Sequence, residues 1–150
     1  GGLAGSILSA LLNPVYIYSV GASGAIFAII GAELVYLYYQ RHLFGEFGKI
    51  RRKNLIFIAA INLLAGFVAD AAGGMQIDNY GHLGGFIGGL LLAWFISPQL
   101  NLVPHPEKAN EILAEDTNPL RQKYWVVSLY LVAMIVLVFI GTLGARGAGS

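Results

Sequence analysis

Two residues, Ser23 and His82, are of types that could act together as a catalytic pair. Ser23 lies in the sequence Gly-Ala-Ser-Gly directly before a long apolar stretch, and His82 lies in Tyr-Gly-His-Leu-Gly-Gly at the start of another. Polar and ionisable side chains are costly in such stretches, so each is expected to have a function or a partner there. A serine hydroxyl beside an imidazole is the arrangement of a nucleophile activated by a base.

The composition indicates the environment of this pair. Of the 150 residues, 57% are hydrophobic and 11% are charged, and the mean hydropathy is +0.68. This balance fits neither a soluble domain nor a disordered one. A membrane-spanning helix needs ~20 mostly apolar residues. Four stretches approach that length, namely Val20 to Tyr39, Leu55 to Ala72, Tyr80 to Ser97 and Tyr124 to Leu143. The sequence therefore predicts an all-α, polytopic transmembrane helical bundle.

Other features exclude several classes of function. The chain has no cysteine, which excludes disulfides, thiolate metal sites and a cysteine nucleophile. The net charge is +1 and no basic patch typical of nucleic-acid binding is present, so no nucleic-acid partner is expected. A shorter apolar stretch, Gly1 to Leu12, is expected to be the end of a helix that begins before this sequence.

The distribution of Lys and Arg predicts the orientation of the bundle. Segment 40–54, expected to be a loop, has five basic residues and one acid, whereas segment 71–79 has no Lys or Arg. Basic loops stay in the cytoplasm, so 40–54 is predicted to be cytoplasmic, as is the linker 98–123 two spans later. The first and third full spans then begin on the extracytoplasmic side. Ser23 and His82 are therefore expected in the same leaflet.

Small residues predict how the two helices pack. His82, Gly85 and Gly89 follow i, i+3, i+7 and lie on one helical face. On the first full span, Gly24 and Ala28 repeat a small residue every four positions. Such faces let two helix backbones approach closely. We expect the two helices to pack tightly, with the serine and the histidine at the mouth of the contact.

Each candidate has a simpler interpretation. Ser23 could be a helix N-cap, because serine is favoured at that position. His82 could be a hydrogen-bonded structural histidine, or a metal ligand. The metal interpretation fails for want of ligands, because the nearest acids, Asp70 and Asp78, lie in or beside the outer loop. His42 and His105, the other two histidines, are expected in loops.

Nearby residues were assigned supporting roles. Glu33 lies about 15 Å deeper than Ser23 at 1.5 Å per residue, too far for a triad acid, and is expected to be a structural or snorkelling carboxylate. Asp78, four residues before His82, either orients the imidazole or caps the loop, and the loop cap is the expected role. Phe27 projects on the face of Ser23, one turn further on, where it packs either against the imidazole or in an ordinary core. The segment Glu107 to Asp116 is expected to be a short solvated helix.

Two motifs resemble those of a known family, the rhomboid intramembrane serine proteases. The stretch Val20 to Phe27 resembles the family's G-x-S-G nucleophile motif, and Gly81 to Gly89 resembles its histidine helix. Gly1 to Ser6 also resembles the helix before the nucleophile loop. The resemblance covers residues 1–97 as part of the catalytic core, which leaves 98–123 as a cytoplasmic linker and 124–150 as an additional transmembrane helix with a tail.

The resemblance implies a mechanism and a set of site residues. Ser23 is the implied nucleophile and His82 the general base of a dyad that cuts transmembrane protein substrates near the extracytoplasmic face, without metal or cofactor. The Ser23 amide contributes to the oxyanion hole, Gly21 leaves the hydroxyl open to substrate, and Phe27 takes the position of an aromatic ring under the histidine. The implied location is the plasma membrane, with the lipid bilayer as surroundings.

One departure from the family pattern bears on activity. The family's oxyanion-stabilising His and Asn come from an earlier helix in an H-x-x-x-N pattern, which this sequence does not contain. Loss of one oxyanion donor costs ~10²- to 10³-fold in rate. We therefore expect this segment to be the C-terminal part of a longer enzyme and to be poorly active alone. The alternatives are a rhomboid-like pseudoprotease that binds transmembrane segments without cleavage and, with less support, a transporter.

Overall fold

The computed structural model describes residues 1–12, 22–73, 77–108 and 110–147. These ranges contain mainly helices, with one small sheet and a single 3-10 turn η1, Leu120–Gln122. The helices are α1 (Gly2–Leu12), α2 (Ser23–Tyr39), α3 (Arg41–Ala71), α4 (Asn79–Ile96) and α5 (Tyr124–Gly147). The predicted helical class is thus confirmed over most of the chain, and the sheet is an addition to it.

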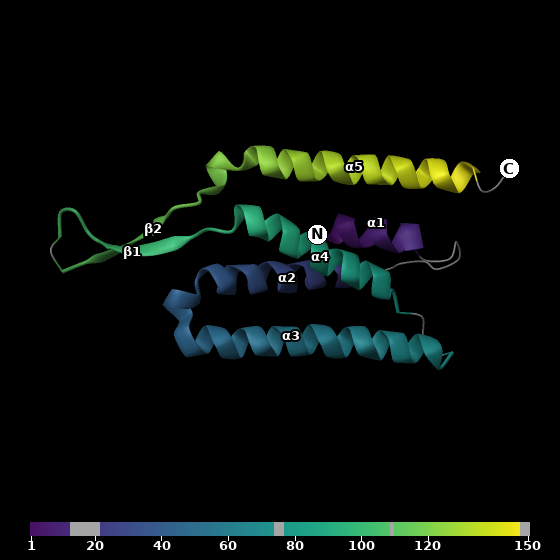
Figure 1. Ribbon diagram of the computed structural model, residues 1–150, viewed down its shortest axis with the longest axis horizontal. Coiled ribbons are helices and arrows are strands. Elements are labelled where there is room, and N and C mark those ends of the chain that lie inside the picture. Colours follow the sequence, from purple (N-terminus) through teal and green to yellow (C-terminus); the bar gives the residue numbers. More distant parts are fainter. Residues whose placement is uncertain (13–21, 74–76, 109, 148–150) are drawn as a thin grey trace.

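The helices form a layered bundle around α4 (Figure 1). The most extensive contacts of α4 are with α2 and then with α1. Helix α3 lies on the outer side of α2, and α5 lies on the opposite side of the bundle, beyond α1 and α4. Helices α2 and α4 run in the same direction, so their first turns lie at the same end of the bundle. This arrangement brings the regions of Ser23 and His82 to one level.

Glycines allow the close approach of α2 and α4. A methyl group on Gly85 would collide with the Gly24 carbonyl, and one on Gly89 would collide with the backbone of Ala28. These are the small-residue positions that the sequence predicted to meet. The predicted packing face is therefore confirmed.

The segment 40–54 is helical, and the prediction of a loop there is wrong. Helix α3 already begins at Arg41, directly after α2, and bends at Gly45, which has a φ of 47°. Only glycine adopts this left-handed conformation without steric cost, so one residue supplies the turn that a whole loop was expected to provide. The basic residues consequently lie on the first turns of a helix.

The segment 107–116 does not form the expected solvated helix. Strands β1 (Leu100–Pro104) and β2 (Ile112–Asp116) pair in an antiparallel hairpin, from Leu100 opposite Asp116 to Pro104 opposite Ile112. The hairpin extends beyond the end of the helical bundle (Figure 1). Segment 112–116 forms a strand despite its helix propensity because each of its residues pairs with a residue of β1, and such cross-strand pairs stabilise a strand.

A buried glutamine joins the α2–α3 corner to the end of α4. Gln40 is fully buried. Its Nε2 donates to the Pro98 carbonyl at 2.8 Å, and its Oε1 accepts from the Leu100 amide at 3.2 Å. Pro98 lies in the connection between α4 and β1, and Leu100 is the first residue of β1. This glutamine therefore fixes the end of the bundle that is remote from Ser23.

One helix meets the length and composition expected of a membrane span. It covers Arg41–Ala69, and only 17% of its most apolar window is buried. The other apolar helices of the described ranges are shorter, at Gly2–Leu12, Ser23–Tyr39 and Tyr124–Ile140. Large apolar side chains on α3 and α5, such as Phe57 and Leu129, are more than half exposed. Of the four predicted spans, one is thus confirmed by this criterion.

Candidate active site

Ser23 is the first residue of α2. The N-cap residue is Ala22, whose side chain makes no capping hydrogen bond, so the interpretation of Ser23 as the N-cap is wrong. Ser23 is exposed. The first amides of a helix lack intrahelical acceptors, and the helix dipole favours negative charge near them. The serine hydroxyl therefore lies where an oxyanion would be stabilised.

His82 lies in the first turn of α4 and is buried, with 9% exposed. Its imidazole stacks on the ring of Phe27, with ring centroids 4.5 Å apart and an interplanar angle of 13°. The predicted contact between Phe27 and the imidazole is therefore confirmed. Asp78 is the N-cap of α4 and accepts a hydrogen bond from the Gly81 amide at 2.7 Å, as the prediction of a capping role required.

The backbones beside Ser23 and His82 touch. A methyl group on Gly24 would lie 3.1 Å from the Gly81 carbonyl oxygen. Gly24 follows Ser23 directly, and Gly81 directly precedes His82. Two residues 59 positions apart in the sequence thus start neighbouring helices at one contact. No hydrogen bond joins their side chains among the described residues, and in the absence of substrate such bonds are often long or poorly aligned.

A small cavity adjoins the serine. Its volume is about 100 Å³, which is enough for at least one water molecule. It is lined by residues of α1, α2 and the start of α4, including Ser6, Ser23, Asp78 and Gly81. Neither His82 nor Phe27 lines it. Gly21, the other residue predicted to lie beside the substrate, is outside the described residues.

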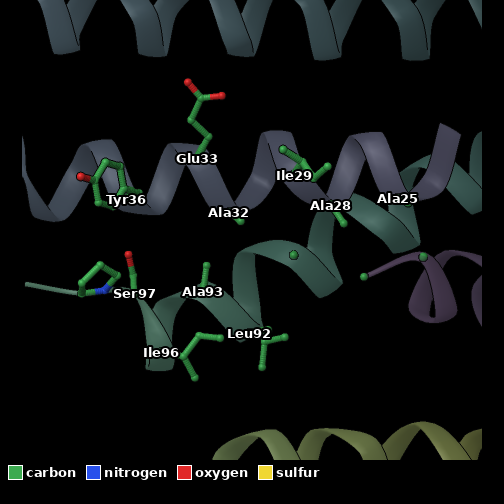
Figure 2. A pocket seen from close by; sticks show the side chains of 14 residues that line it. Ala25, Ala28, Ile29, Ala32, Glu33, Tyr36, Leu92, Ala93, Ile96 and Ser97 are labelled. Atoms are coloured by element: carbon green, nitrogen blue, oxygen red, sulfur yellow. The ribbon is translucent and has the colours of Figure 1, made fainter. Parts of the chain in front are cut away.

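A larger cavity lies elsewhere. It has a volume of about 710 Å³ between α2 and α4, and neither Ser23 nor His82 lines it (Figure 2). Its walls are apolar residues such as Ala28, Ala32 and Ala93. Within the described ranges, no group of three His, Asp or Glu side chains could bind a metal ion.

Glu33 has a partner that the sequence analysis missed. Its carboxylate forms an ion pair with Arg51 of α3, with Nε to Oε1 at 2.7 Å and Nη2 to Oε2 at 3.3 Å. In Figure 2 the side chain points away from α4, toward α3. The sequence feature that could have predicted this ion pair is an acid within an apolar stretch, followed by several basic residues in segment 49–53. The expected structural role is consistent with this pair, which holds α2 and α3 together away from Ser23.

Comparisons with known proteins identify relatives of the chain. A family model for the Rhomboid domain matches residues 1–99. RHOMBOID-like protein 1 of Arabidopsis thaliana is 36% identical over 138 residues, which cover 87% of this chain and 33% of that protein. RHOMBOID-like protein 4 of the same plant is 32% identical over 91% of the chain and 32% of its own length.

A bacterial relative carries a functional name. Rhomboid protease GluP of Bacillus subtilis is 41% identical over 92 residues, which cover 61% of this chain and 16% of that protein. The chain spans about a third of the length of the first two plant relatives. No solved structure gave a significant match. The match of the family model to residues 1–99, together with the helix contact beside the serine and the histidine, shows that the chain belongs to the rhomboid family, whose members are integral membrane proteins.

Proposed function

We propose that this protein is an intramembrane serine endopeptidase that cleaves transmembrane protein substrates, with Ser23 as nucleophile and His82 as general base. The observation that carries the proposal is the contact between Gly24 and Gly81. It joins the first turns of α2 and α4 directly beside the two side chains. The stack of His82 on Phe27 supports it further, because the imidazole is held against the helix that begins with the serine.

The proposed reaction has two steps. His82 Nε2 takes the proton of the Ser23 hydroxyl while the oxygen attacks the carbonyl carbon of a peptide bond. The tetrahedral intermediate collapses, the C–N bond breaks, and the imidazolium gives its proton to the leaving amine. A water molecule, deprotonated by His82, then attacks the acyl-enzyme and releases the second product with regeneration of the hydroxyl.

Two features support catalysis at this position. The free amides at the start of α2, including that of Ser23, are oriented to stabilise the developing oxyanion. The cavity beside Ser23 provides room for a water molecule next to the nucleophile. We assign Gly21 to the substrate side of the nucleophile, where the absence of a side chain leaves the hydroxyl accessible. Phe27 supports the base from below. No metal or organic cofactor enters the scheme.

We further propose an orientation and a substrate class. The basic residues at the start of α3 favour a cytoplasmic position for that end of the bundle, as judged by Lys and Arg alone. The opposite end, with Ser23 and His82, then faces the extracytoplasmic side of the plasma membrane. A transmembrane substrate would be cut near that face, where its helix unwinds and its peptide bond meets water.

Labelling with a serine-reactive fluorophosphonate tests the proposal. The full-length protein containing this segment should be labelled in the membrane, and Ser23→Ala should abolish the label. Ser128→Ala is the matched control, because Ser128 is an exposed serine on α5, remote in sequence from the proposed nucleophile. The Ser128→Ala protein should be labelled as strongly as the wild type. A pseudoprotease that only binds transmembrane segments would show equal, background labelling in all three proteins.

A further inference from the structure

Two buried polar atoms in the first turn of α4 have no hydrogen-bond partner in the described part of the chain. They are Oδ1 of Asn79 and Nδ1 of His82. Their residues are 5% and 9% exposed, respectively. Buried polar groups are nearly always hydrogen-bonded, directly or through water. Two orphans in one helical turn therefore call for a common explanation.

The spacing of the two residues places their side chains on one face of α4. Asn79 and His82 are three residues apart on α4, and side chains at that spacing are neighbours on a helix surface. Side chains on a helix also lean toward its N-terminus. The imidazole of His82 consequently leans over the turn that begins with Asn79.

The two atoms are complementary in chemistry. For His82 to take a proton on Nε2, that nitrogen must be unprotonated, so the neutral ring must carry its hydrogen on Nδ1. Nδ1–H is then a donor without an acceptor, and Oδ1 of Asn79 is an acceptor without a donor. Each atom supplies what the other lacks.

We propose that Asn79 is a positioning residue for His82, whose Nδ1–H donates to the Asn79 amide oxygen through one water molecule. This hydrogen bond selects the tautomer in which Nε2 is the base. The inference rests on the proposed function, because it assigns Asn79 a part in the activation of Ser23.

The stack on Phe27 does not perform this task. Stacking fixes the plane of the imidazole. A ring flipped by 180° about the Cβ–Cγ bond would lie in the same plane and stack equally well, but Nδ1 and a carbon atom would exchange places. A hydrogen bond to Nδ1 distinguishes the two orientations. Phe27 thus sets the plane of the ring, and Asn79 sets which edge faces the serine.

Helix α3 holds Asn79 in place. Oδ1 of Asn79 faces Gly66 of α3, where an added methyl group would collide with it. Asp78, the neighbouring acid, already accepts from the Gly81 amide as the cap of α4. Asn79 is therefore the side chain in this turn that is held by another helix and retains an unused acceptor.

The direct test is the ¹⁵N spectrum of the His82 imidazole in the full-length protein, assigned by difference from His82→Ala. The expected result is a single tautomer with the proton on Nδ1. Substitution Asn79→Leu should give a mixture of tautomers, and Asn79→Asp, which keeps an acceptor, should restore the Nδ1–H form. A wild-type spectrum with the proton on Nε2 would overturn the proposal, even if no variant folds.

Kinetics give a second, independent readout. Asn79→Leu should slow fluorophosphonate labelling of Ser23 about 10- to 100-fold. This is less than the ~10⁴-fold loss that follows when a triad acid is replaced by an amide that selects the wrong tautomer, because the leucine leaves a fraction of His82 in the active tautomer. Gly66→Ala should act in the same direction from another helix. Asn62→Leu is the matched control, since Asn62 is exposed and donates only to the Ile58 carbonyl of its own helix.

The outcomes separate this inference from the proposed function. If Ser23→Ala abolishes labelling but Asn79→Leu labels at the wild-type rate, the positioning role is wrong and the protease proposal stands. If Ser23→Ala leaves labelling unchanged, the protease proposal itself fails. Loss of labelling in Asn79→Leu together with an unchanged His82 tautomer would show a structural role only, and would also contradict the inference.

Discussion

The imidazole of His82 on α4 lies flat on the ring of Phe27 on α2, with centroids 4.5 Å apart and planes 13° from parallel. Phe27 is one helical turn past Ser23. The stack therefore ties the proposed base to the helix of the proposed nucleophile, and it does so with both side chains buried.

Removal of this stack should impair both stability and activity. Phe27→Leu keeps an apolar side chain but loses the aromatic pair, which contributes about 0.5–1.5 kcal/mol beyond its buried area. We expect a lower thermal unfolding temperature in detergent and labelling of Ser23 slowed by up to about tenfold, the equivalent of 1.4 kcal/mol. Phe57→Leu, at a residue that is 64% exposed on α3, is the control. Equal effects of the two substitutions would argue against a role of the stack.

The contact of Gly85 with Gly24 should tolerate no larger residue. A side chain on Gly85 meets backbone atoms of α2, which cannot move aside as a flexible side chain can. We expect Gly85→Leu to separate α2 from α4, to lower the free energy of unfolding by at least 1–3 kcal/mol, the usual range for overpacking, and to reduce serine labelling.

The control for that contact is Gly48→Leu on α3, where an added methyl group would lie 2.8 Å from Phe44 Cβ of the same helix and would meet no atom of α2 or α4. It therefore measures a local clash that does not separate α2 from α4. Unchanged stability and labelling in Gly85→Leu would show that this face does not carry the contact.

Activity should not depend on a nearby carboxylate. Asp78 is a helix cap, and asparagine caps helices as well as aspartate does, so Asp78→Asn should retain most of the stability and most of the cleavage. Glu33→Gln should also retain most of the cleavage, because Glu33 pairs with Arg51 away from the serine. Cleavage assays on a transmembrane substrate check both. A loss of ~10⁴-fold in Asp78→Asn with intact folding would instead identify a catalytic triad.

Gln40 should stabilise the far end of the bundle without affecting chemistry. Gln40→Leu removes one hydrogen bond to the connection between α4 and β1 and one to the first residue of β1. It leaves the Pro98 carbonyl and the Leu100 amide without these partners. We expect a loss of about 1–3 kcal/mol in the free energy of unfolding and faster hydrogen exchange at the Leu100 amide.

Serine labelling of the folded Gln40→Leu protein should equal that of the wild type. Gln122→Leu, at an exposed glutamine, is the control and should alter neither the free energy of unfolding nor the hydrogen exchange at the Leu100 amide. Unchanged exchange at Leu100 in Gln40→Leu would refute the role of this side chain.

The sequence predicted the site better than it predicted the connections. The small residues at Gly24, Ala28, Gly85 and Gly89 determine which helix faces can meet, and the structure confirms that contact. Helical periodicity left Phe27 either against the imidazole or in an ordinary core, and in the structure it stacks on the imidazole. These features follow from local patterns on single helices, which explains why they were accessible.

Features that depend on distant partners were missed. Hydropathy assigned the charged start of α3 to a loop, although one glycine, Gly45, provides the turn. Strand β2 was read as helix because its partner β1 could not be identified from local propensity. The unpartnered atoms of Asn79 and His82 depend on burial by other helices, which no spacing along α4 reveals.

The central claim is that Ser23 and His82 together cut a peptide bond, and the most direct measurement is cleavage of a transmembrane substrate by the full-length protein in proteoliposomes. Ser23→Ala and His82→Ala should each abolish cleavage while the folded fraction, measured by thermal unfolding, stays at the wild-type level. The double variant should be no worse than either single one, because residues that act as a unit are not additive. Cleavage that persists in folded Ser23→Ala protein would contradict the account.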